Sequence, residues 1–388
     1  MKFLGYKRPD GRVGIRNHVL ILSTVGCAAE VARQVAEGLN GAVSFINQNG
    51  CGETEKNLKR TRDVLVGMIA NPNVYGAIAI GLGCEINQMG DFLKLVRERT
   101  NKPVEYLLIQ EEGGSINTIA KATRLAQRMI IEASTCKREE CDISNLILGV
   151  ECGGSDATSG LVANPVMGLV SDKLIAMGAT SMFSETVEMI GAEHLLAKRA
   201  VTPELGQRIL QIVHAREEEQ NAVGEDIRKT QPSPGNRAGG ITTLEEKSLG
   251  CIHKGGHTPV MEFVDYAQEP TKKGLVLMDT PCYDLVSVTA KAAGGCQLIV
   301  FTTGRGNTVG NPVVPVMKVT ANGMTYRHME DNHDMDLSGV LDGKLSLEEQ
   351  ADIVLAEILR ILEGKMTKAE VLKFGYSETV ISRACEYC

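Results

Sequence analysis

Short apolar runs alternate with amphipathic stretches along the first part of the chain. Residues 19–25 (VLILSTV) are apolar and rich in β-branched side chains, and the next segment, 28–39, has the spacing of an amphipathic helix. Apolar strands that alternate with helices are typical of a buried parallel sheet. The pattern therefore predicts a doubly wound α/β domain over residues 1–140. Its further strands are expected at 42–46, 75–80 and 104–109, and its further helices at 55–70, 88–100 and after Gly114.

The same alternation restarts after a charged connector at 136–144. It predicts a second α/β block over residues 141–224, a Gly- and Pro-rich linker loop over 225–240, and a C-terminal α/β block over 241–388. The fold class is thus α/β and doubly wound, with mostly parallel sheets in two or three Rossmann-like blocks. The later strands are expected at 146–150, 180–183, 274–278, 297–302 and 313–319, and the later helices at 192–199, 203–219, 242–249, 284–293 and 345–362.

Composition narrows the class of protein. The chain has 388 residues, enough for two or three domains at roughly 150 residues each. A net charge of −7 and an aromatic content of 4% argue against a nucleic-acid partner. No apolar run is long enough for a membrane helix, and the N-terminus does not look like a signal peptide. The 11 scattered cysteines indicate reduced thiols, so we expect a cytoplasmic protein.

Three predicted strands end in loops that place a cysteine beside glycine and near glutamate. The loops are NGCGE at 49–53, GLGCE at 81–85 and ECGGSD at 151–156. Ligands of open α/β sheets bind at the carboxyl ends of strands, so Cys51, Cys84 and Cys152 are expected on one rim. Thiolates there could hold iron or an iron–sulfur cluster, whereas the alternative is three small residues in tight turns. The CEYC sequence of Cys385 and Cys388 is interpreted as incidental.

Other polar groups lie in comparable positions. Glu185 follows a predicted strand, His194 lies at a helix start, and His253 and Lys254 stand between glycines. Arg305 lies in the Gly-rich loop TTGRGNTVG, where its guanidinium could bind a carboxylate and the backbone N–H groups an anion. The alternative for His194 is a hydrogen-bonded structural role, and the alternative for the Arg305 loop is a plain polar turn. The chain lacks a phosphate loop with GKS or GKT, which argues against nucleotide binding.

Several motifs together resemble one family. They are KRPDGRVGIRNHVLIL, NGCGE, GLGCEINQ, ECGGSDATSGLVANP, GAEHLLAKRA, GNRAGGITTLEEKSLGCIHKGG, MDTP and FTTGRGNTVGNPVVPVMKV. In order and over essentially the whole chain, they resemble the large catalytic domain of the altronate and galactarate dehydratases. The same family includes the large (beta) subunit of (2R)-sulfolactate sulfo-lyase.

The resemblance implies a function and a set of roles. It implies β-elimination from a 2-hydroxy acid, with iron (Fe²⁺ or an iron–sulfur cluster) or another divalent metal as cofactor. Because the chain begins at the GYKRPDG motif, a separate small SAF-type (β-clip) subunit is expected as partner in an oligomeric enzyme. The expected residues are Cys51, Cys84 and Cys152 for the metal, Arg305, Ser155, Asp156 and Asn307 for the substrate, and His194, Glu185, Lys254 and His253 for catalysis.

Three hypotheses remain open at this point. The first is the large subunit of an altronate-type dehydratase, which eliminates water from a sugar acid. The second is the large subunit of a (2R)-3-sulfolactate sulfo-lyase, which eliminates sulfite to give pyruvate. The third is a noncatalytic scaffold for a catalytic small subunit.

Overall fold

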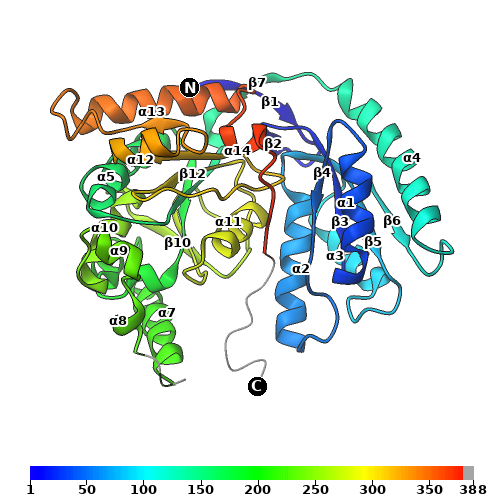
Figure 1. The fold of residues 1–388 in the computed structure, drawn as a ribbon, viewed down its shortest axis with the longest axis horizontal. Helices are drawn as coiled ribbons and strands as arrows, with labels where there is room; N and C mark the ends of the chain where they lie inside the picture. The colour runs from blue at the N-terminus through cyan, green and yellow to red at the C-terminus, as the bar shows by residue number, and fades with distance from the viewer. Residues whose placement is uncertain (223, 225, 379–388) are drawn as a thin grey trace.

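The chain forms two α/β lobes that stand side by side (Figure 1). The structure, a computed structural model, describes residues 1–222, 224 and 226–378. Cys385, Cys388 and the first residue of the predicted linker lie outside the described residues. The N-terminal lobe holds a four-stranded sheet and the C-terminal lobe a seven-stranded sheet. Strands of the second and third predicted blocks therefore share one sheet, while the exact domain boundaries stay a proposal.

The N-terminal lobe has the predicted doubly wound arrangement. Its strands pair in parallel in the order β4-β3-β5-β6. Helices α1 and α4 pack against one face, and α2 and α3 against the other. The strands are β3 (His18–Ser23), β4 (Ala42–Phe45), β5 (Val74–Gly81) and β6 (Val104–Leu108), and the helices are α1 (Ala29–Glu37), α2 (Glu55–Ala70), α3 (Met89–Arg99) and α4 (Ser115–Ser134).

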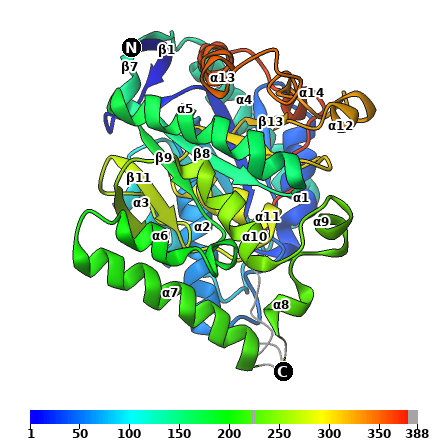
Figure 2. The ribbon, with the colours of Figure 1, turned by 90° about the vertical axis from the view of Figure 1, so that its left-hand side faces the viewer.

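The C-terminal lobe is built on a parallel sheet with the order β10-β11-β9-β8-β12-β13-β14, and Figure 2 shows it from the side. The parallel pairing in both lobes confirms the predicted fold class. Its strands are β8 (Ile147–Cys152), β9 (Thr180–Phe183), β10 (Val260–Val264), β11 (Gly274–Met278), β12 (Leu298–Thr302), β13 (Val316–Thr320) and β14 (Met335–Asp336). Its longer helices are α5 (Asn164–Ala176), α6 (Glu193–Lys198), α7 (Pro203–Ala222), α10 (Leu244–Ile252), α11 (Asp284–Ala293), α12 (Gly323–His328) and α13 (Leu347–Leu362).

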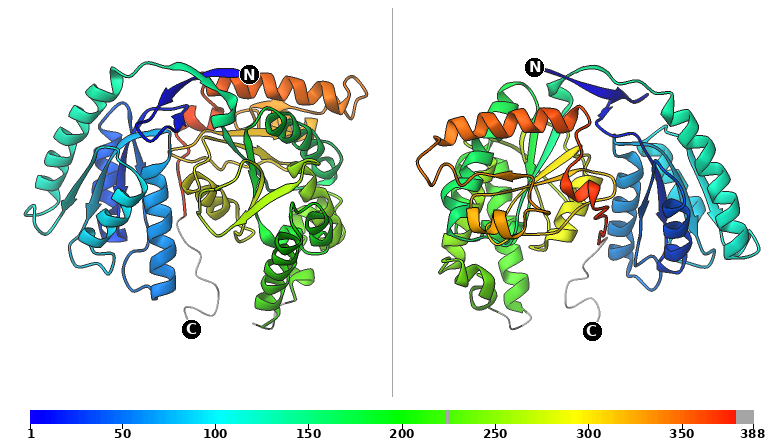
Figure 3. Two further views of the ribbon diagram at one scale, coloured as in Figure 1. Left: turned by 180° about the vertical axis from the view of Figure 1, so that it is seen from behind. Right: turned by 45° about the horizontal axis from the view of Figure 1, so that its top comes forward.

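Several elements are absent from the sequence-based prediction. The N-terminal strand β1 (Lys2–Lys7) pairs antiparallel with β7 (Glu139–Asp142), inside the predicted connector, and with β2 (Val13–Gly14). Seen from behind and from above, β1 and β7 run across the top between the lobes (Figure 3). Their charged, half-exposed residues hide the strand pattern. The predicted linker also contains two short helices, α8 (Ile227–Thr230) and α9 (Pro234–Ala238), and α14 (Lys368–Val371) follows α13.

The two lobes meet through direct helix packing. Helix α2 of the N-terminal lobe lies so close to α11 that a Cβ at Gly67 would stand 2.3 Å from the carbonyl oxygen of Ala293. Beside this contact, the Asn71 side chain donates hydrogen bonds to the carbonyls of Ala292 (2.7 Å) and Cys296 (2.9 Å). These contacts fix the position of each lobe against the other.

The segment 372–378 runs down between the lobes (Figure 1). The Gln48 side chain of the N-terminal lobe donates to the carbonyl of Ser377 at 3.0 Å. On the other side, the carbonyl of Phe374 lies close to Gly310 of the C-terminal lobe. The segment therefore contacts both lobes.

Within the described residues, none of the helices combines the length and the apolar character that crossing a membrane requires.

The close approach at Gly67 predicts a stability effect. An alanine in a helix interior normally stabilises relative to glycine by up to about 1 kcal/mol. Gly67→Ala, however, should destabilise the protein by about 1–3 kcal/mol, because the methyl group meets backbone of α11. Urea unfolding followed by circular dichroism measures the change. Gly90→Ala in α3 is the matched control, since a Cβ there meets nothing within 4 Å. Equal stability of the two variants would contradict the packing described here.

Candidate functional site

Carboxylates, thiols and lysines gather at the carboxyl ends of the adjacent strands β8, β9 and β11. Cys152 ends β8, Glu185 and Glu188 follow β9, and Cys282 follows β11. Helix α10 and the turn after it contribute the remaining members. We call the set Cys152, Glu185, Glu188, Lys247, Cys251, Lys254 and Cys282 the buried cluster. All of its members are buried except Cys282, which is half-buried.

Glu188 lies at the centre of the buried cluster. One of its carboxylate oxygens, Oε2, accepts hydrogen bonds from the thiols of Cys251 (3.0 Å) and Cys152 (3.2 Å). These two sulfur atoms are 3.4 Å apart. The other carboxylate oxygen lies 3.7 Å from the sulfur of Cys282. Three thiols from separate parts of the chain therefore converge on one carboxylate.

Two buried ammonium groups balance these acidic groups. Lys247 Nζ lies 2.9 Å from Glu188 Oε1, and Lys254 Nζ lies 2.9 Å from the Cys152 sulfur and 3.6 Å from Glu188 Oε2. Burial alone would raise the pKa of Glu188, but the two lysines and the Cys251 hydrogen bond outweigh it and hold that pKa well below its usual range. The pKa of Lys254 is raised, because the neighbouring thiols and carboxylates outweigh the burial that would lower it.

Glu185 combines backbone strain with an unpaired carboxyl oxygen. Its backbone is left-handed, with φ 69° and ψ 71°, although it is not glycine. It is 1% exposed, and within the described part of the chain its Oε2 has no hydrogen-bond partner. Burial, and then the negative charge of Glu188, raise the pKa of this carboxyl well above its usual value. Strained residues and unpaired buried groups concentrate at functional sites.

A second ionisable carboxyl stands beside Glu185. Burial and the nearby Glu188 raise the pKa of Asp284 to about 6, although a hydrogen bond from Asn307 opposes the shift. The Asn307 amide donates to Asp284 Oδ2 at 2.6 Å. Asp284 can therefore exchange a proton near neutral pH.

Below these groups, Glu151 and Lys291 form a fully buried ion pair. The hydroxyl groups of Ser184 and Ser287 also contact this pair. Among the described residues, the acidic and thiol side chains of this region form three groups whose ligand atoms all lie within 4.8 Å of one another. The groups are Cys152 with Glu188 and Cys251, Glu185 with Glu188 and Cys282, and Glu151 with Glu185 and Asp284.

The structure brings only some of the residues expected from the sequence to this site. Cys152, Glu185 and Lys254 belong to the buried cluster. Asn307 donates a hydrogen bond to Asp284, which lies beside Glu185 of the cluster. Ser155 is buried nearby, and among the described residues its hydroxyl oxygen has no partner. His194, His253 and Arg305 have exposed side chains.

Asp156 and two of the predicted metal ligands stand apart from the buried cluster. The carboxylate of Asp156 accepts hydrogen bonds from Thr158, Ser159 and Asn322, so it holds its own loop in place. Cys51 and Cys84 follow strands of the other sheet and have exposed thiols. The three predicted cysteines therefore do not share one rim.

Sequence reasoning missed Glu188, Cys282 and Asp284, and it assigned no catalytic or ligand role to Lys247 and Cys251, which lie between glycines in the segment 239–256. The sequence does contain a pattern that links three residues of the buried cluster. Lys247, Cys251 and Lys254 are spaced by four and three residues, which places them on one face of a helix. Because Lys247 directly follows two glutamates in the sequence, its surroundings suggest the solvated face of a charged helix. Glu188 and Cys282 carry no such signal, since only the strand order brings β9 next to β11.

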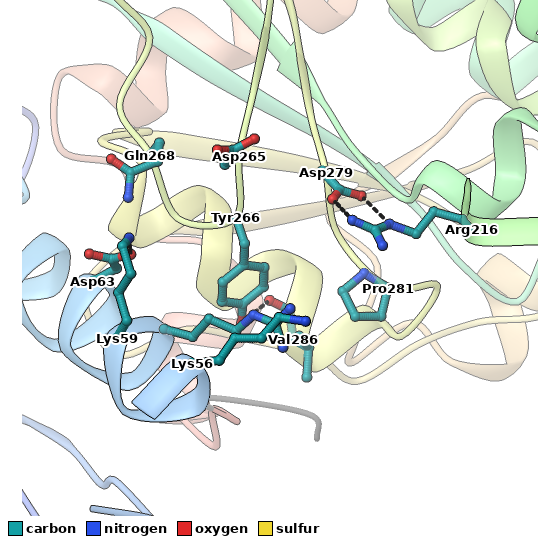
Figure 4. A pocket seen from close by; sticks show the side chains of 11 residues that line it. Lys56, Lys59, Asp63, Arg216, Asp265, Tyr266, Gln268, Asp279, Pro281 and Val286 are labelled. Atoms are coloured by element: carbon teal, nitrogen blue, oxygen red, sulfur yellow. Dashed lines mark hydrogen bonds and ion pairs between the residues drawn. The ribbon is translucent and has the colours of Figure 1, made fainter. Parts of the chain in front are cut away.

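A cavity of about 550 Å³ opens between the lobes next to the buried cluster. Figure 4 shows Lys56 and Lys59 on α2 at one side and Arg216 from α7 at the other. Arg216 donates to the Asp279 carboxylate at 3.0 Å. The cavity is lined by Lys56, Lys59, Arg60, Asp63, Arg216, Asp265, Tyr266, Gln268, Asp279, Pro281 and Val286. Since Pro281 and Val286 flank Cys282 and Asp284 in the sequence, one short segment separates the cavity from the buried cluster.

The fold and site define an α/β protein with buried proton-exchanging groups beside a basic cavity, as in enzymes that act on small anions. The family model for the second domain of D-galactarate dehydratase/altronate hydrolase matches residues 5–134. The model for the C-terminal domain of D-galactarate/altronate dehydratase matches residues 143–386. The chain therefore belongs to the D-galactarate/altronate dehydratase family.

Similar proteins from three bacteria agree with this assignment. The chain is 40% identical to the (2R)-sulfolactate sulfo-lyase subunit beta of Chromohalobacter salexigens, over 99% of this chain and 98% of that protein. It is 35% identical to the altronate dehydratase of Escherichia coli, over 93% of this chain and 74% of that protein. It is 36% identical to the altronate dehydratase of Bacillus subtilis, over 84% and 66% respectively. Because these relatives are dehydratases and a sulfo-lyase, the chain is a lyase.

The charge balance at Glu188 predicts a stability effect. Glu188→Gln leaves Lys247 and Lys254 without their main carboxylate partner and should destabilise the fold by about 3–5 kcal/mol at neutral pH. Because the folded-state pKa of Glu188 lies below its ordinary value of 4.5, this stabilisation is present above that pH and is lost as the pH falls. Urea unfolding of both proteins from pH 7 downward should therefore show a difference that shrinks on acidification.

Glu140→Gln serves as the control for this measurement. Glu140 pairs with Lys2 on the surface, where both side chains are 62% exposed, so the substitution should change stability little. A difference between wild type and Glu188→Gln that stays constant across the pH range would contradict the charge balance described above.

Proposed function

We propose that the chain is the large catalytic subunit of a metal-dependent lyase that removes the α proton of a 2-hydroxy acid and expels a substituent from the β carbon. The observation that carries the proposal is Glu185, a buried and strained residue whose Oε2 has no partner among the described residues and which lies near Lys254 and the cavity. A carboxyl whose pKa is raised by burial is a stronger base than an exposed one, and it suits abstraction of a weakly acidic proton.

The remaining residues of the buried cluster supply what such a reaction needs. Removing a proton next to a carboxylate creates a dianion, which positive charges must stabilise. Lys254 and Lys247 provide two fixed ammonium groups at the site. Asp284, with a pKa of about 6, is the candidate acid that delivers a proton toward the leaving group. In this assignment Glu185 takes the α proton and Asn307 orients Asp284.

The family resemblance also implies iron or another divalent metal, and the buried cluster offers a chemically suitable set of donors. Cys152, Cys251 and Glu188 present two thiols and one carboxylate with ligand atoms within 4.8 Å of one another, a soft set that suits iron. These three residues would hold the ion. When bound, the ion supplies a Lewis acid for an oxygen of the substrate.

The charge of the cavity bears on the substrate. Lys56, Lys59, Arg60 and Arg216 give its lining four basic side chains against three aspartates. A net positive lining favours a substrate with two anionic groups, such as 3-sulfolactate, which carries a carboxylate and a sulfonate. Sulfite elimination from (2R)-3-sulfolactate is therefore our preferred reaction. Water elimination from a sugar acid of the altronate type is the second candidate, supported by the similarity to the altronate dehydratases.

A partner subunit belongs to the proposal. The relative from Chromohalobacter salexigens is named as a beta subunit, so it has at least one other subunit. We infer that this chain works with a small SAF-type (β-clip) polypeptide in a cytoplasmic oligomer.

A substrate comparison tests the reaction. The chain, co-purified with its small subunit and loaded anaerobically with ferrous iron, is incubated separately with sulfolactate and with altronate. We expect sulfite and pyruvate in equal amounts from sulfolactate, measured with a thiol reagent for sulfite and with lactate dehydrogenase for pyruvate. A 2-keto acid formed from altronate, with no sulfite from sulfolactate, would establish dehydration instead.

Replacing Glu185 tests the catalytic role of this chain. Glu185→Gln keeps the size of the side chain but removes the base, so kcat should fall by about 10²–10⁴-fold while KM changes little. Steady-state kinetics of the reconstituted enzyme measure both constants, with Glu140→Gln as the surface control. An unchanged kcat would favour the hypothesis that this chain is a scaffold whose partner carries the active site.

A further inference from the structure

Two short segments at neighbouring strand ends fix the strained backbone of Glu185. Glu185 and Thr186 follow β9, and Asp279 and Thr280 follow β11, which pairs in parallel with β9. The N–H of Glu185 donates to the Thr280 hydroxyl at 2.9 Å, and the N–H of Thr186 donates to the Thr280 carbonyl at 3.1 Å. A left-handed conformation at a residue other than glycine persists only when its surroundings fix it. These contacts therefore help to keep Glu185 in its strained conformation.

The side chain of Thr186 adds a further contact between the two segments. Thr186 is fully buried, and its hydroxyl donates to Asp279 Oδ1 at 2.7 Å. A hydrogen bond from a hydroxyl to a carboxylate is short and directional, so it fixes the residue directly after Glu185. Thr186 also begins the short 3₁₀ helix Thr186–Met189, which carries Glu188 of the buried cluster.

Arg216 binds the other side of the Asp279 carboxylate. Its Nε donates to Asp279 Oδ1 at 3.0 Å, and its Nη2 pairs with Oδ2. This two-point contact uses one edge of the guanidinium and fixes its plane. Arg216 and Asp279 both line the cavity. A chain of contacts from Arg216 through Asp279 to Thr186 therefore leads from the cavity wall to the residue beside Glu185.

The remaining part of the Arg216 guanidinium has a more exposed partner. Nη1 donates to both carboxylate oxygens of Glu219, at 2.7 and 2.8 Å. The Glu219 side chain is 44% exposed, whereas that of Asp279 is 11% exposed. Exposed ion pairs contribute little free energy. An incoming anion would therefore compete with Glu219 for Nη1, while Asp279 keeps the other edge of the guanidinium.

Basic side chains also stand on the opposite wall of the cavity. Figure 4 shows Lys56 and Lys59 on α2 across from Arg216. Cations on two walls suit a ligand with an anionic group at each end. Arginine is well matched to oxyanions, because its planar fork offers several N–H donors. One anionic group of such a ligand can meet Arg216 while the other lies near the lysines.

We propose that Arg216 binds one anionic group of the substrate and, through Asp279 and Thr186, positions the strained backbone of Glu185 for proton abstraction. The inference rests on the proposed function, in which Glu185 is the base. Arg216 would touch the substrate, whereas Asp279 and Thr186 are positioning residues that act through Glu185. The side chain that binds the substrate would thus also set the position of the base.

Steady-state kinetics of two Thr186 variants test the positioning role. Thr186→Val keeps the shape of the side chain but removes the hydroxyl, so kcat should fall by about 10–10²-fold while KM changes little. Thr186→Ser restores the donor and should recover most of kcat. Both variants are measured in the reconstituted enzyme, and circular dichroism checks that they fold. An unchanged kcat in Thr186→Val, or an equal loss in Thr186→Ser, would overturn the positioning role.

Binding of sulfoacetate tests the contact at Arg216. This dianion has a carboxylate and a sulfonate but no β carbon, so it cannot undergo the elimination. Isothermal titration calorimetry of the reconstituted enzyme should show binding that is about 10-fold weaker in Arg216→Gln. Glu219→Gln removes the competing carboxylate and should tighten binding by about two- to fivefold. Arg33→Gln, in exposed ion pairs on α1, is the matched control and should leave the affinity unchanged.

The opposite binding results would overturn the contact. An unchanged affinity in Arg216→Gln would show that Arg216 does not bind the anion. Weaker binding in Glu219→Gln would show that Glu219 does not compete with the anion for Arg216.

Arg216→Gln also covers the case in which Thr186→Val fails to fold, because the Arg216 side chain is 20% exposed. Its kcat at saturating substrate should fall together with its affinity, since Asp279 loses the partner that fixes it. An unchanged kcat would overturn the connection between Arg216 and Glu185.

Failure of the proposed function would have a different signature. Wild type would then turn over neither sulfolactate nor altronate, and the catalytic half of this inference would fall with the proposed function. The sulfoacetate titration would still decide whether Arg216 binds an anion in the cavity.

Discussion

Charge compensation around Glu188 is the constraint on which the C-terminal lobe depends. A carboxylate removed from water is stable only when cations and hydrogen-bond donors surround it, and here Lys247, Lys254 and two thiols do so. Both lysines come from one segment, α10 and the turn after it, so this segment must dock closely on the sheet. Gly168 permits the docking, because a Cβ there would lie 2.2 Å from the carbonyl oxygen of His253. The close packing of this segment on the rest of the lobe therefore also places the two lysines beside Glu188.

The strained backbone of Glu185 connects this site to the cavity. Its N–H donates to the Thr280 hydroxyl at 2.9 Å, and the neighbouring Thr186 hydroxyl donates to Asp279 at 2.7 Å. Asp279 in turn pairs with Arg216 in the cavity. The surroundings thus hold an unfavourable conformation in place, which is how strain persists at functional sites. The residues that position the base also arrange the charges that meet an incoming anion.

The sequence predicted the sheet well and the site only in part, for physical reasons. The apolar runs of the parallel strands are continuous because both faces of each strand are covered, so they are easily recognised. Strand β1 alternates buried and exposed residues and pairs with the charged β7, so neither has that signature. His253 was expected to act in catalysis beside Lys254, but neighbours on a helical turn point in different directions, and only Lys254 faces inward. Glu188 and Cys282 meet through strand order, which local sequence does not encode.

Similar Gly-Cys motifs serve different purposes because their strand ends are covered differently. In the C-terminal lobe, the turn after α10 (His253–Gly255) packs against β8 and β9, and Cys152 is buried there with Lys254. The residue before Cys152, Glu151, is then drawn into a buried ion pair with Lys291. In the N-terminal lobe the described chain leaves Cys51 and Cys84 exposed, and their nearby glutamates bind backbone N–H groups instead. One motif thus gives a lysine-paired thiol where a helical segment covers it and an exposed thiol where none of the described residues does. Burial rather than residue type decides which chemistry each loop can perform.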